Sequence, residues 1–181
     1  MIYGEKIRLR RIEREDIATF VRWFGDPDVR NFLLINRPIS KAEEERWFEN
    51  QLQDESSELF AIESSDGQEN VHIGNIGLHD INWLHRHAEL GIVIGEKNYW
   101  SKGYGSDAVR TLLRFAFHEM NLHRVTLRVY EDNARGIRAY EKCGFEHEGR
   151  MREAIFRQGR YYDELRMGIL DREFDAQSQT G

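Results

Sequence analysis

Apolar residues along this chain recur in some stretches with the spacing of strands and in others with the spacing of helices. The order of these stretches constrains the fold more than any other feature of the sequence. Alternation of apolar and polar residues, which is typical of strands, occupies residues 5–12, 59–62, 71–83, 88–94, 125–129 and, in two parts, 146–170. Helical spacing occupies residues 16–24, 41–53, 104–120 and 133–144. Several strands follow one another without a helix between them, so we expect antiparallel pairing. The order predicts a mixed α+β domain and differs from a regular alternation of strand and helix.

Capping and turn residues mark the ends of several of these elements. Ser40 with Glu43 forms a capping box at the start of the second helix. Asn133 is a typical N-cap and Gly144 a typical glycine after a helix end, so a short helix is expected between them. Ser65-Asp66-Gly67 predicts a hairpin turn between two strands. The longest helix has one apolar stripe, made of Val109, Leu112, Leu113, Ala116, Phe117 and Met120.

Length and composition fit one folded domain. The chain has 181 residues, of which 40% are apolar and 32% charged, as expected for one core under a polar surface. We expect a single domain over residues 1–174 and a polar C-terminal tail over residues 175–181. No apolar stretch approaches the ~20 residues of a membrane span, and the first residues lack the apolar core of a signal peptide. A cytoplasmic protein without a membrane partner is therefore expected.

Charge and cysteine content argue against several kinds of site. The formal net charge of −6 disfavours non-specific binding of nucleic acid, so no nucleic-acid partner is expected. The single cysteine, Cys143, excludes an internal disulfide and multi-cysteine metal sites, and we interpret it as a small buried apolar residue rather than a nucleophile. His85 and His87 have no evident third ligand, so no metal is expected.

A glycine-containing loop precedes the longest helix. In Lys102-Gly103-Tyr104-Gly105-Ser106, backbone amides can approach an anion where no Cβ blocks them, and the helix N-terminus adds positive potential. A dinucleotide fingerprint, and with it an oxidoreductase, is a rival interpretation. The glycines of that fingerprint follow their strand directly, whereas about eight residues separate this loop from the strand that ends near Ile94. By itself the loop indicates an anion site without naming its ligand.

Three blocks of the sequence together resemble the Gcn5-related N-acetyltransferase (GNAT) superfamily. They are residues 89–94, residues 100–106 and the pattern from Asn133 to Phe145. The resemblance is strongest over residues 73–170, and the chain is most similar to the branch that contains ribosomal-protein N-terminal acetyltransferases and spermidine N-acetyltransferases. It implies an α+β, GNAT-like fold with a central, mixed, mostly antiparallel sheet of about seven strands flanked by about four helices.

The resemblance also implies acetyl-CoA as cosubstrate, with its pyrophosphate held by the glycine loop. Tyr140 would lie beside the CoA sulfur and Glu89 near the acceptor amine. Asn133 would hold the pantetheine or its nearby backbone, while also serving as an ordinary N-cap. The residues expected to bind the cofactor are Ile92, Val93, Ile94, Trp100, Ser101, Lys102, Gly103, Tyr104, Gly105, Ser106, Asn133 and Gly136.

Acetyl transfer to an amine needs a proton acceptor for the ammonium, donors for the oxyanion and a proton for the leaving thiolate. Glu89 lies in an otherwise apolar strand, where burial would raise its pKa, and is the candidate base, acting directly or through a water. The structural alternative for Glu89 is an ion pair with Arg86. Tyr140 is the candidate acid because tyrosine is protonated at neutral pH. The alternative is a core aromatic that shares a helix face with Ile137.

We therefore expect an N-acetyltransferase that moves an acetyl group from acetyl-CoA to a primary amine by direct attack. The acceptor is left open between a small polyamine-like amine and a protein N-terminus. Glutamates of the second helix are expected to form a mostly solvated face, with some of them attracting a cationic acceptor; they are Glu43, Glu44, Glu45 and Glu49. The alternative function is a catalytically silent acyl-CoA-binding sensor or interaction module on the same fold. A homo-oligomer is also left open.

Overall fold

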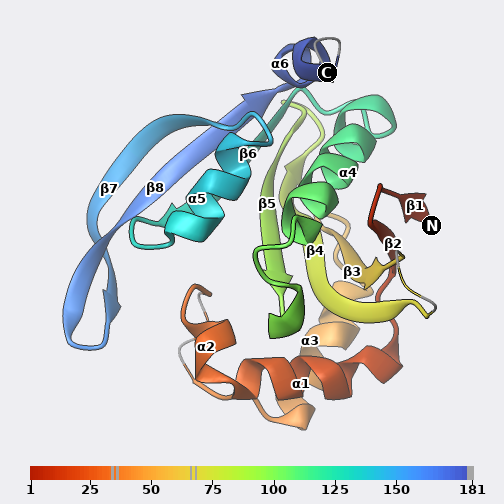
Figure 1. Ribbon diagram of the computed structural model, residues 1–181, viewed down its shortest axis with the longest axis vertical. Coiled ribbons are helices and arrows are strands. Elements are labelled where there is room, and N and C mark those ends of the chain that lie inside the picture. The colour runs from red at the N-terminus through yellow and green to blue at the C-terminus, as the bar shows by residue number, and fades with distance from the viewer. Residues whose placement is uncertain (34, 36, 66, 68, 179–181) are drawn as a thin grey trace.

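One mixed sheet runs through the molecule (Figure 1). The computed structural model describes residues 1–33, 35, 37–65, 67 and 69–178, and within them the sheet has eight strands in the order β1-β2-β3-β4-β5-β6-β8-β7. The strands are β1 (Ile2–Tyr3), β2 (Ile7–Arg11), β3 (Glu58–Ser64), β4 (Val71–Asn82), β5 (His87–Ile94), β6 (Arg124–Tyr130), β7 (Glu146–Arg157) and β8 (Arg160–Leu170). Only β5 and β6 pair in parallel among these strands. The predicted mixed, mostly antiparallel sheet is therefore confirmed.

The helices lie at several places around this sheet. They are α1 (Ile17–Gly25), α2 (Pro27–Arg30), α3 (Lys41–Gln51), α4 (Tyr104–His118), α5 (Ala134–Glu141) and α6 (Asp171–Ser178). In Figure 1, α4 lies along the centre of the sheet, whereas α1, α2 and α3 gather near the end of β5 and α6 lies at the opposite end of the molecule. None of the described helices is long and apolar enough to cross a membrane.

Two apolar clusters pack the helices against the sheet and against one another. The larger cluster lies between α4 and the sheet, and the stripe predicted for α4 is buried there from Val109 to Phe117, with Met120 partly buried. Burial of such a stripe is the main source of stability for an amphipathic helix. The smaller cluster is built on Phe20, Trp23, Phe24 and Val29 and joins α1 and α2 to the segments beside them.

The sheet divides between β5 and β6. These two strands pair over only three residues each, His87–Glu89 with Arg124–Thr126. Beyond that point β5 stays paired with β4 as far as Ile94, and β6 stays paired with β8 as far as Tyr130. The facing edges of β5 and β6 therefore separate, and beyond these residues their backbone groups no longer pair with each other. Since buried backbone groups are normally hydrogen-bonded, this opening is a place where a ligand can supply the missing partners.

Most predicted elements are present, with differences at their ends. The structure adds β1, which is only two residues long, and α2, which Asp26 caps by accepting a hydrogen bond from the amide of Asp28 at 2.9 Å. The predicted hairpin turn includes Asp66, which lies outside the described residues. The boundary expected after residue 174 falls inside α6, in which Phe174 is buried against Phe117 with ring centroids 5.5 Å apart.

Candidate active site

The glycine loop enters α4 through two glycines with different roles. Gly103 is the N-cap and has φ +92°, a left-handed conformation that a side chain would strain. Gly105 lies in the first turn with ordinary helical geometry, and a Cβ there would come no closer than 3.7 Å to a side-chain atom of Ile94. The first amides of a helix have no intrahelical acceptor. The bare surface at Gly105 therefore leaves these amides open to an anionic ligand.

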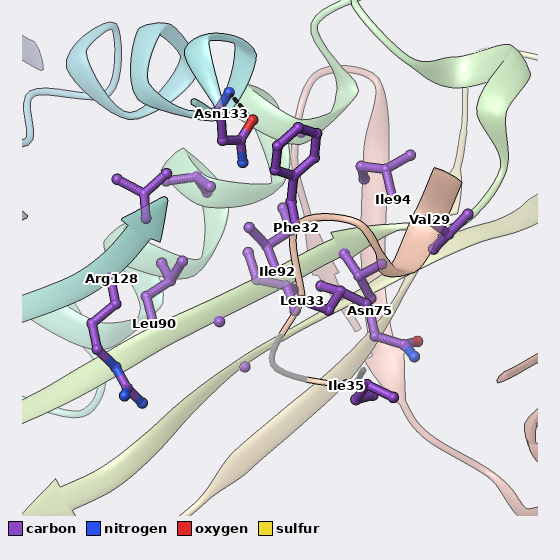
Figure 2. Close-up of a pocket in the computed structure, with 18 of the residues that line it drawn as sticks. Val29, Phe32, Leu33, Ile35, Asn75, Leu90, Ile92, Ile94, Arg128 and Asn133 are labelled. Atoms are coloured by element: carbon purple, nitrogen blue, oxygen red, sulfur yellow. Dashed lines mark hydrogen bonds between the residues drawn. The ribbon is translucent and has the colours of Figure 1, made fainter. Parts of the chain in front are cut away.

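A cavity of about 720 Å³ opens where β5 and β6 separate (Figure 2). Its wall includes Glu89 and Tyr140. At one end, which we call the loop end, it is lined by ten of the residues predicted to bind the cofactor: Ile92, Val93, Ile94, Trp100, Ser101, Gly103, Gly105, Ser106, Asn133 and Gly136. Lys102 and Tyr104 are not part of its wall. The Tyr104 ring is buried at 5.0 Å from the ring of Tyr99, and the carbonyl of Lys102 accepts a hydrogen bond from Lys6 at 3.2 Å.

Asn133 serves as the N-cap of α5, as its alternative interpretation predicted. Its Oδ1 accepts a hydrogen bond from the amide of Gly136 at 2.9 Å, the contact drawn as a dashed line in Figure 2. A Cβ at position 136 would lie 2.6 Å from Asn133 Nδ2, so a larger residue there would displace the folded-back amide. Asn133 also lines the cavity. Capping and ligand contact are therefore compatible for this side chain.

Trp100 and Arg135 contact each other at the loop end. Trp100 was among the residues predicted to bind the cofactor, whereas Arg135 was not. The indole Nε1 of Trp100 donates to the carbonyl of Ile94 at 2.7 Å, at the edge of β5 that faces the opening. The Arg135 guanidinium lies 4.0 Å from the centre of the Trp100 ring, in cation–π contact. The two residues are far apart in sequence, so no local signal could have paired them. Together they place a positive charge beside the glycine loop.

Tyr140, on α5, is part of the cavity wall. Its ring packs against Phe145, with centroids 6.0 Å apart, and burial raises the pKa of its hydroxyl to about 12. The hydroxyl is therefore protonated throughout the physiological range. Cys143 is buried nearby, burial raises its pKa to about 11, and its thiol contacts the carbonyl of Ser106 at 3.5 Å. These surroundings agree with a small buried apolar role for Cys143.

Glu89 is ion-paired, but with a different partner from the one considered in the sequence analysis. Its Oε1 accepts from Arg128 Nε at 2.6 Å, and its Oε2 lies 3.9 Å from Arg166 Nη1. Arg86 instead donates to Asn121 at 3.2 Å. The carboxylate is thus held at the wall by two arginines, one from β6 and one from β8.

His79 stands opposite Glu89 in the register of β4 and β5 and also lines the cavity. Burial lowers the pKa of its imidazole below 6.5, so the ring is neutral at physiological pH. Asp80, Glu89, Asp54 and Arg128 are the charged groups that act on it. The other two histidines considered, His85 and His87, stack on each other, and no group of three metal-ligating side chains occurs within the described ranges.

The second end of the cavity, which we call the layer end, is enclosed by α1, α2, α3 and the segments between them. Its apolar wall consists of Ile12, Phe24, Val29, Phe32, Leu33, Ile35, Ile39, Trp47 and Leu59. In Figure 2, side chains of Phe32, Leu33 and Ile35 and side chains of β5 point into the same space. The segment after α2 is fixed across the opening because the Tyr130 hydroxyl donates to the Leu33 carbonyl at 3.1 Å.

Glu44 is a second residue whose environment the sequence analysis missed. It was expected on a solvated face, but it is only 4% exposed and lines the layer end. Burial raises the pKa of its carboxyl to about 7. Glu44 lies three residues before Trp47 and four before Phe48, which places it on the buried face of α3. Its burial could therefore have been predicted from helical spacing in the sequence. The capping box of Ser40 and Glu43 is confirmed.

Comparison with known proteins identifies the family. The sequence profile described as "Acetyltransferase (GNAT) domain" matches residues 6–146. The chain belongs to the GNAT family of acetyltransferases. A spermidine N(1)-acetyltransferase of Vibrio cholerae is 30% identical over 97% of this chain and 99% of its own length. An uncharacterised N-acetyltransferase of Bacillus subtilis, derived from the SPbeta prophage, is 32% identical over 95% of this chain and 94% of its own length.

Comparison with solved structures supports the same family. The spermidine N-acetyltransferase from Vibrio cholerae in complex with CoA and spermine superposes with a TM-score of 0.87 at 29% identity, covering 94% of this chain and 99% of that chain. The protein is therefore an acetyl-CoA-dependent N-acetyltransferase with the α+β GNAT fold, as the sequence motifs implied. The rival oxidoreductase and the silent binding module do not describe it.

Proposed function

We propose that this enzyme acetylates a primary amine that enters the layer end of the cavity while acetyl-CoA occupies the loop end. The observation that carries this proposal is the continuity of the cavity, since one space is lined by the glycine loop, by Tyr140 and Glu89, and by the side chains of the layer end. The relative from Vibrio cholerae was solved with CoA and spermine, which supports an amine acceptor. A small amine or a protein N-terminus meets the chemical requirement equally.

The loop end suits the cofactor through its main chain. The amides of residues 102–106 approach the pyrophosphate across the bare surface of Gly105, and Arg135 adds a positive charge beside them. The free edge of β5 between residues 90 and 94 provides hydrogen-bonding groups for the pantetheine. Acetyl-CoA supplies the activated acetyl group when it is bound. The residues of the chain orient it, exclude water and move protons.

Two residues then handle the protons of the reaction. Glu89 takes the proton of the acceptor ammonium, directly or through a water, and leaves the nitrogen lone pair free for attack on the thioester carbonyl carbon. A C–N bond forms, the C–S bond breaks, and the Tyr140 hydroxyl gives its proton to the departing sulfur. As the amide forms, its nitrogen releases a second proton to solvent, and solvent also returns the proton to Tyr140 and receives the one held by Glu89. The net result is an amide, free CoA and one released proton.

The experiment compares Tyr140→Phe with Tyr161→Phe, a matched change at a tyrosine that is 63% exposed and outside the cavity wall. Thiol release from acetyl-CoA is measured with a panel of primary amines, and CoA binding is measured by titration calorimetry. Tyr140→Phe should lower kcat by about 10²-fold with unchanged CoA affinity, whereas Tyr161→Phe should match the wild type. Near-native kcat for Tyr140→Phe at saturating substrates would contradict the acid role.

A further inference from the structure

The carboxylates around the layer end and the reacting centre are largely neutralised by the chain itself. Glu43 is bound by Arg37 at 2.6 Å, Glu89 by Arg128 at 2.6 Å, and the Oε1 of Glu164 lies 3.4 Å from Arg166 Nε. A carboxylate that already has a guanidinium partner attracts a further cation less, because the pair carries no net charge. Three of the four acidic residues lining the cavity are therefore already matched.

Glu44 is the remaining carboxylate in the cavity wall. No ion pair or side-chain hydrogen bond of Glu44 occurs within the described part of the chain, although the residue is 4% exposed. Residues 34 and 36, which the structure does not describe, are Leu and Asn and carry no charge. Among the described residues, the layer end thus offers one unpaired carboxylate, that of Glu44, which can neutralise one ammonium group of a ligand.

The rest of the layer end is apolar. Phe24, Phe32, Leu33, Ile35, Ile39 and Trp47 enclose a space suited to alkyl or aryl groups, which gain free energy when they leave water. An additional ammonium in this space would lose its hydration without meeting a counter-charge, and such burial is strongly unfavourable. The wall therefore discriminates by the number of charges on the acceptor.

We propose that the acceptor is an amine with one ammonium group and an apolar alkyl or aryl body, rather than a polyamine. This inference rests on the proposed function and narrows its substrate class. The relative of known structure was solved with spermine, but a shared fold does not carry over the lining of the acceptor site. The reaction is the one already described, in which the single amine nitrogen forms the amide.

The test measures kcat/KM at saturating acetyl-CoA for 2-phenylethylamine, hexylamine and spermidine. The expected result is a value for 2-phenylethylamine about 100-fold above that for spermidine, with hexylamine between them, because a buried unpaired charge is rejected more strongly than a missing apolar group. A preference for spermidine would overturn the inference and leave the proposed function standing. Failure to acetylate any amine, with normal CoA binding, would overturn both.

A pair of variants tests the wall directly. Leu33→Glu adds a carboxylate to the layer end, and Leu84→Glu makes the same change at a side chain that is 85% exposed and outside the cavity wall. Leu33→Glu should shift the ratio of kcat/KM values by about 10-fold towards spermidine, and Leu84→Glu should leave the ratio unchanged. Leu33→Gln, of the same shape without charge, should lower 2-phenylethylamine turnover without raising that of spermidine. Equal ratios in the three variants and the wild type would overturn the inference.

Discussion

Glu44 and Glu89 are two carboxylates of one cavity with opposite surroundings. Glu89 is held by Arg128 and Arg166, whereas Glu44 is buried among apolar side chains of α3 and its neighbours. The two arginines hold the Glu89 carboxylate in a fixed place. The Glu44 carboxylate has no such partner among the residues that the structure describes and is available to pair with a cationic ligand. The two residues therefore allow separate tests of proton transfer and of acceptor binding.

The prediction for Glu89 concerns the pH profile of turnover. Glu89→Gln keeps the shape of the side chain and removes its ability to accept a proton, so kcat should fall most at neutral pH and recover partly as pH rises, when more acceptor amine is neutral without help. Glu148→Gln is the control, because it also breaks a Glu–Arg pair, with Arg124, away from the cavity. A loss for Glu89→Gln that is equal at every pH would indicate a binding or structural role.

The prediction for Glu44 concerns stability. Its pKa is about 7 in the folded chain against 4.5 when unperturbed, so the folded state binds the proton more tightly. Its contribution is therefore fully present below pH 4.5 and is lost as pH rises towards 7, at a total cost of about 3 kcal/mol. Glu44→Gln should thus be more stable than the wild type at pH 8, by up to about 3 kcal/mol, and by less than about 1 kcal/mol at pH 5.

Urea unfolding at pH 5 and pH 8 measures this difference. Glu45→Gln is the matched control, since Glu45 is the next residue of α3 and has an exposed side chain near Lys41. It should change the free energy of unfolding by less than about 0.5 kcal/mol at either pH. A Glu44→Gln protein that is less stable than the wild type at pH 8 would mean that the carboxylate has a stabilising partner.

Among the elements, the first turn of α4 offers the sharpest test of cofactor binding. Gly103→Val is a poor probe because any side chain is strained at φ +92°, but Gly105→Val places its Cβ in open space next to Ile94 and should fold normally. It should weaken CoA binding at least about 10-fold by blocking the approach of the phosphates. Gly149→Val, at an exposed glycine of β7 with room for a Cβ, should bind CoA normally in the same calorimetric titration. Unchanged affinity in Gly105→Val would show that the pyrophosphate lies elsewhere.

The elements also show how far sequence reasoning reaches. Strong local patterns predicted α4, the strands and the caps of Ser40 and Asn133, because each depends on residues close together in the chain. The same patterns could not predict the contact of Arg135 with Trp100 or the pairing of Glu89 with Arg128, since both depend on which strands and loops become neighbours. The roles of Tyr140 and Glu89 came from family resemblance and remain predictions.

At the scale of the whole molecule, one polar cluster joins the helical layer to the sheet. Asp16, just before α1, accepts two hydrogen bonds from Arg10 of β2, at 2.7 and 2.8 Å, and its Oδ1 lies 3.1 Å from His72 Nδ1 of β4. Burial opposes ionisation of Asp16, but the Arg10 and His72 contacts keep its pKa well below the usual range. This stabilisation is present above the normal aspartate pKa and is lost as pH falls through the lowered one.

Asp16→Asn should therefore destabilise the fold by about 3 kcal/mol, since Arg10 loses one of its two carboxylate partners and keeps only Glu63, while His72 loses its contact with Asp16. For a chain of this length that corresponds to a fall in Tm of about 6–12 °C in a thermal melt. Asp28→Asn, which removes only an exposed contact with Lys97, should change Tm by about 2 °C or less. A Tm for Asp16→Asn within 2 °C of the wild type would exclude the cluster as the link between the layers.

The separation of β5 from β6 has a consequence for the order of events in catalysis. Leu90 and Ile92 line the cavity from one face of β5, and Gly91 and Val93 line it from the other, so the space passes through the plane of the sheet. Under the proposed function, acetyl-CoA and the acceptor can then approach the centre of the cavity from different faces of the sheet. Neither molecule then has to depart before the other binds, so both substrates can be bound at the same time when transfer occurs.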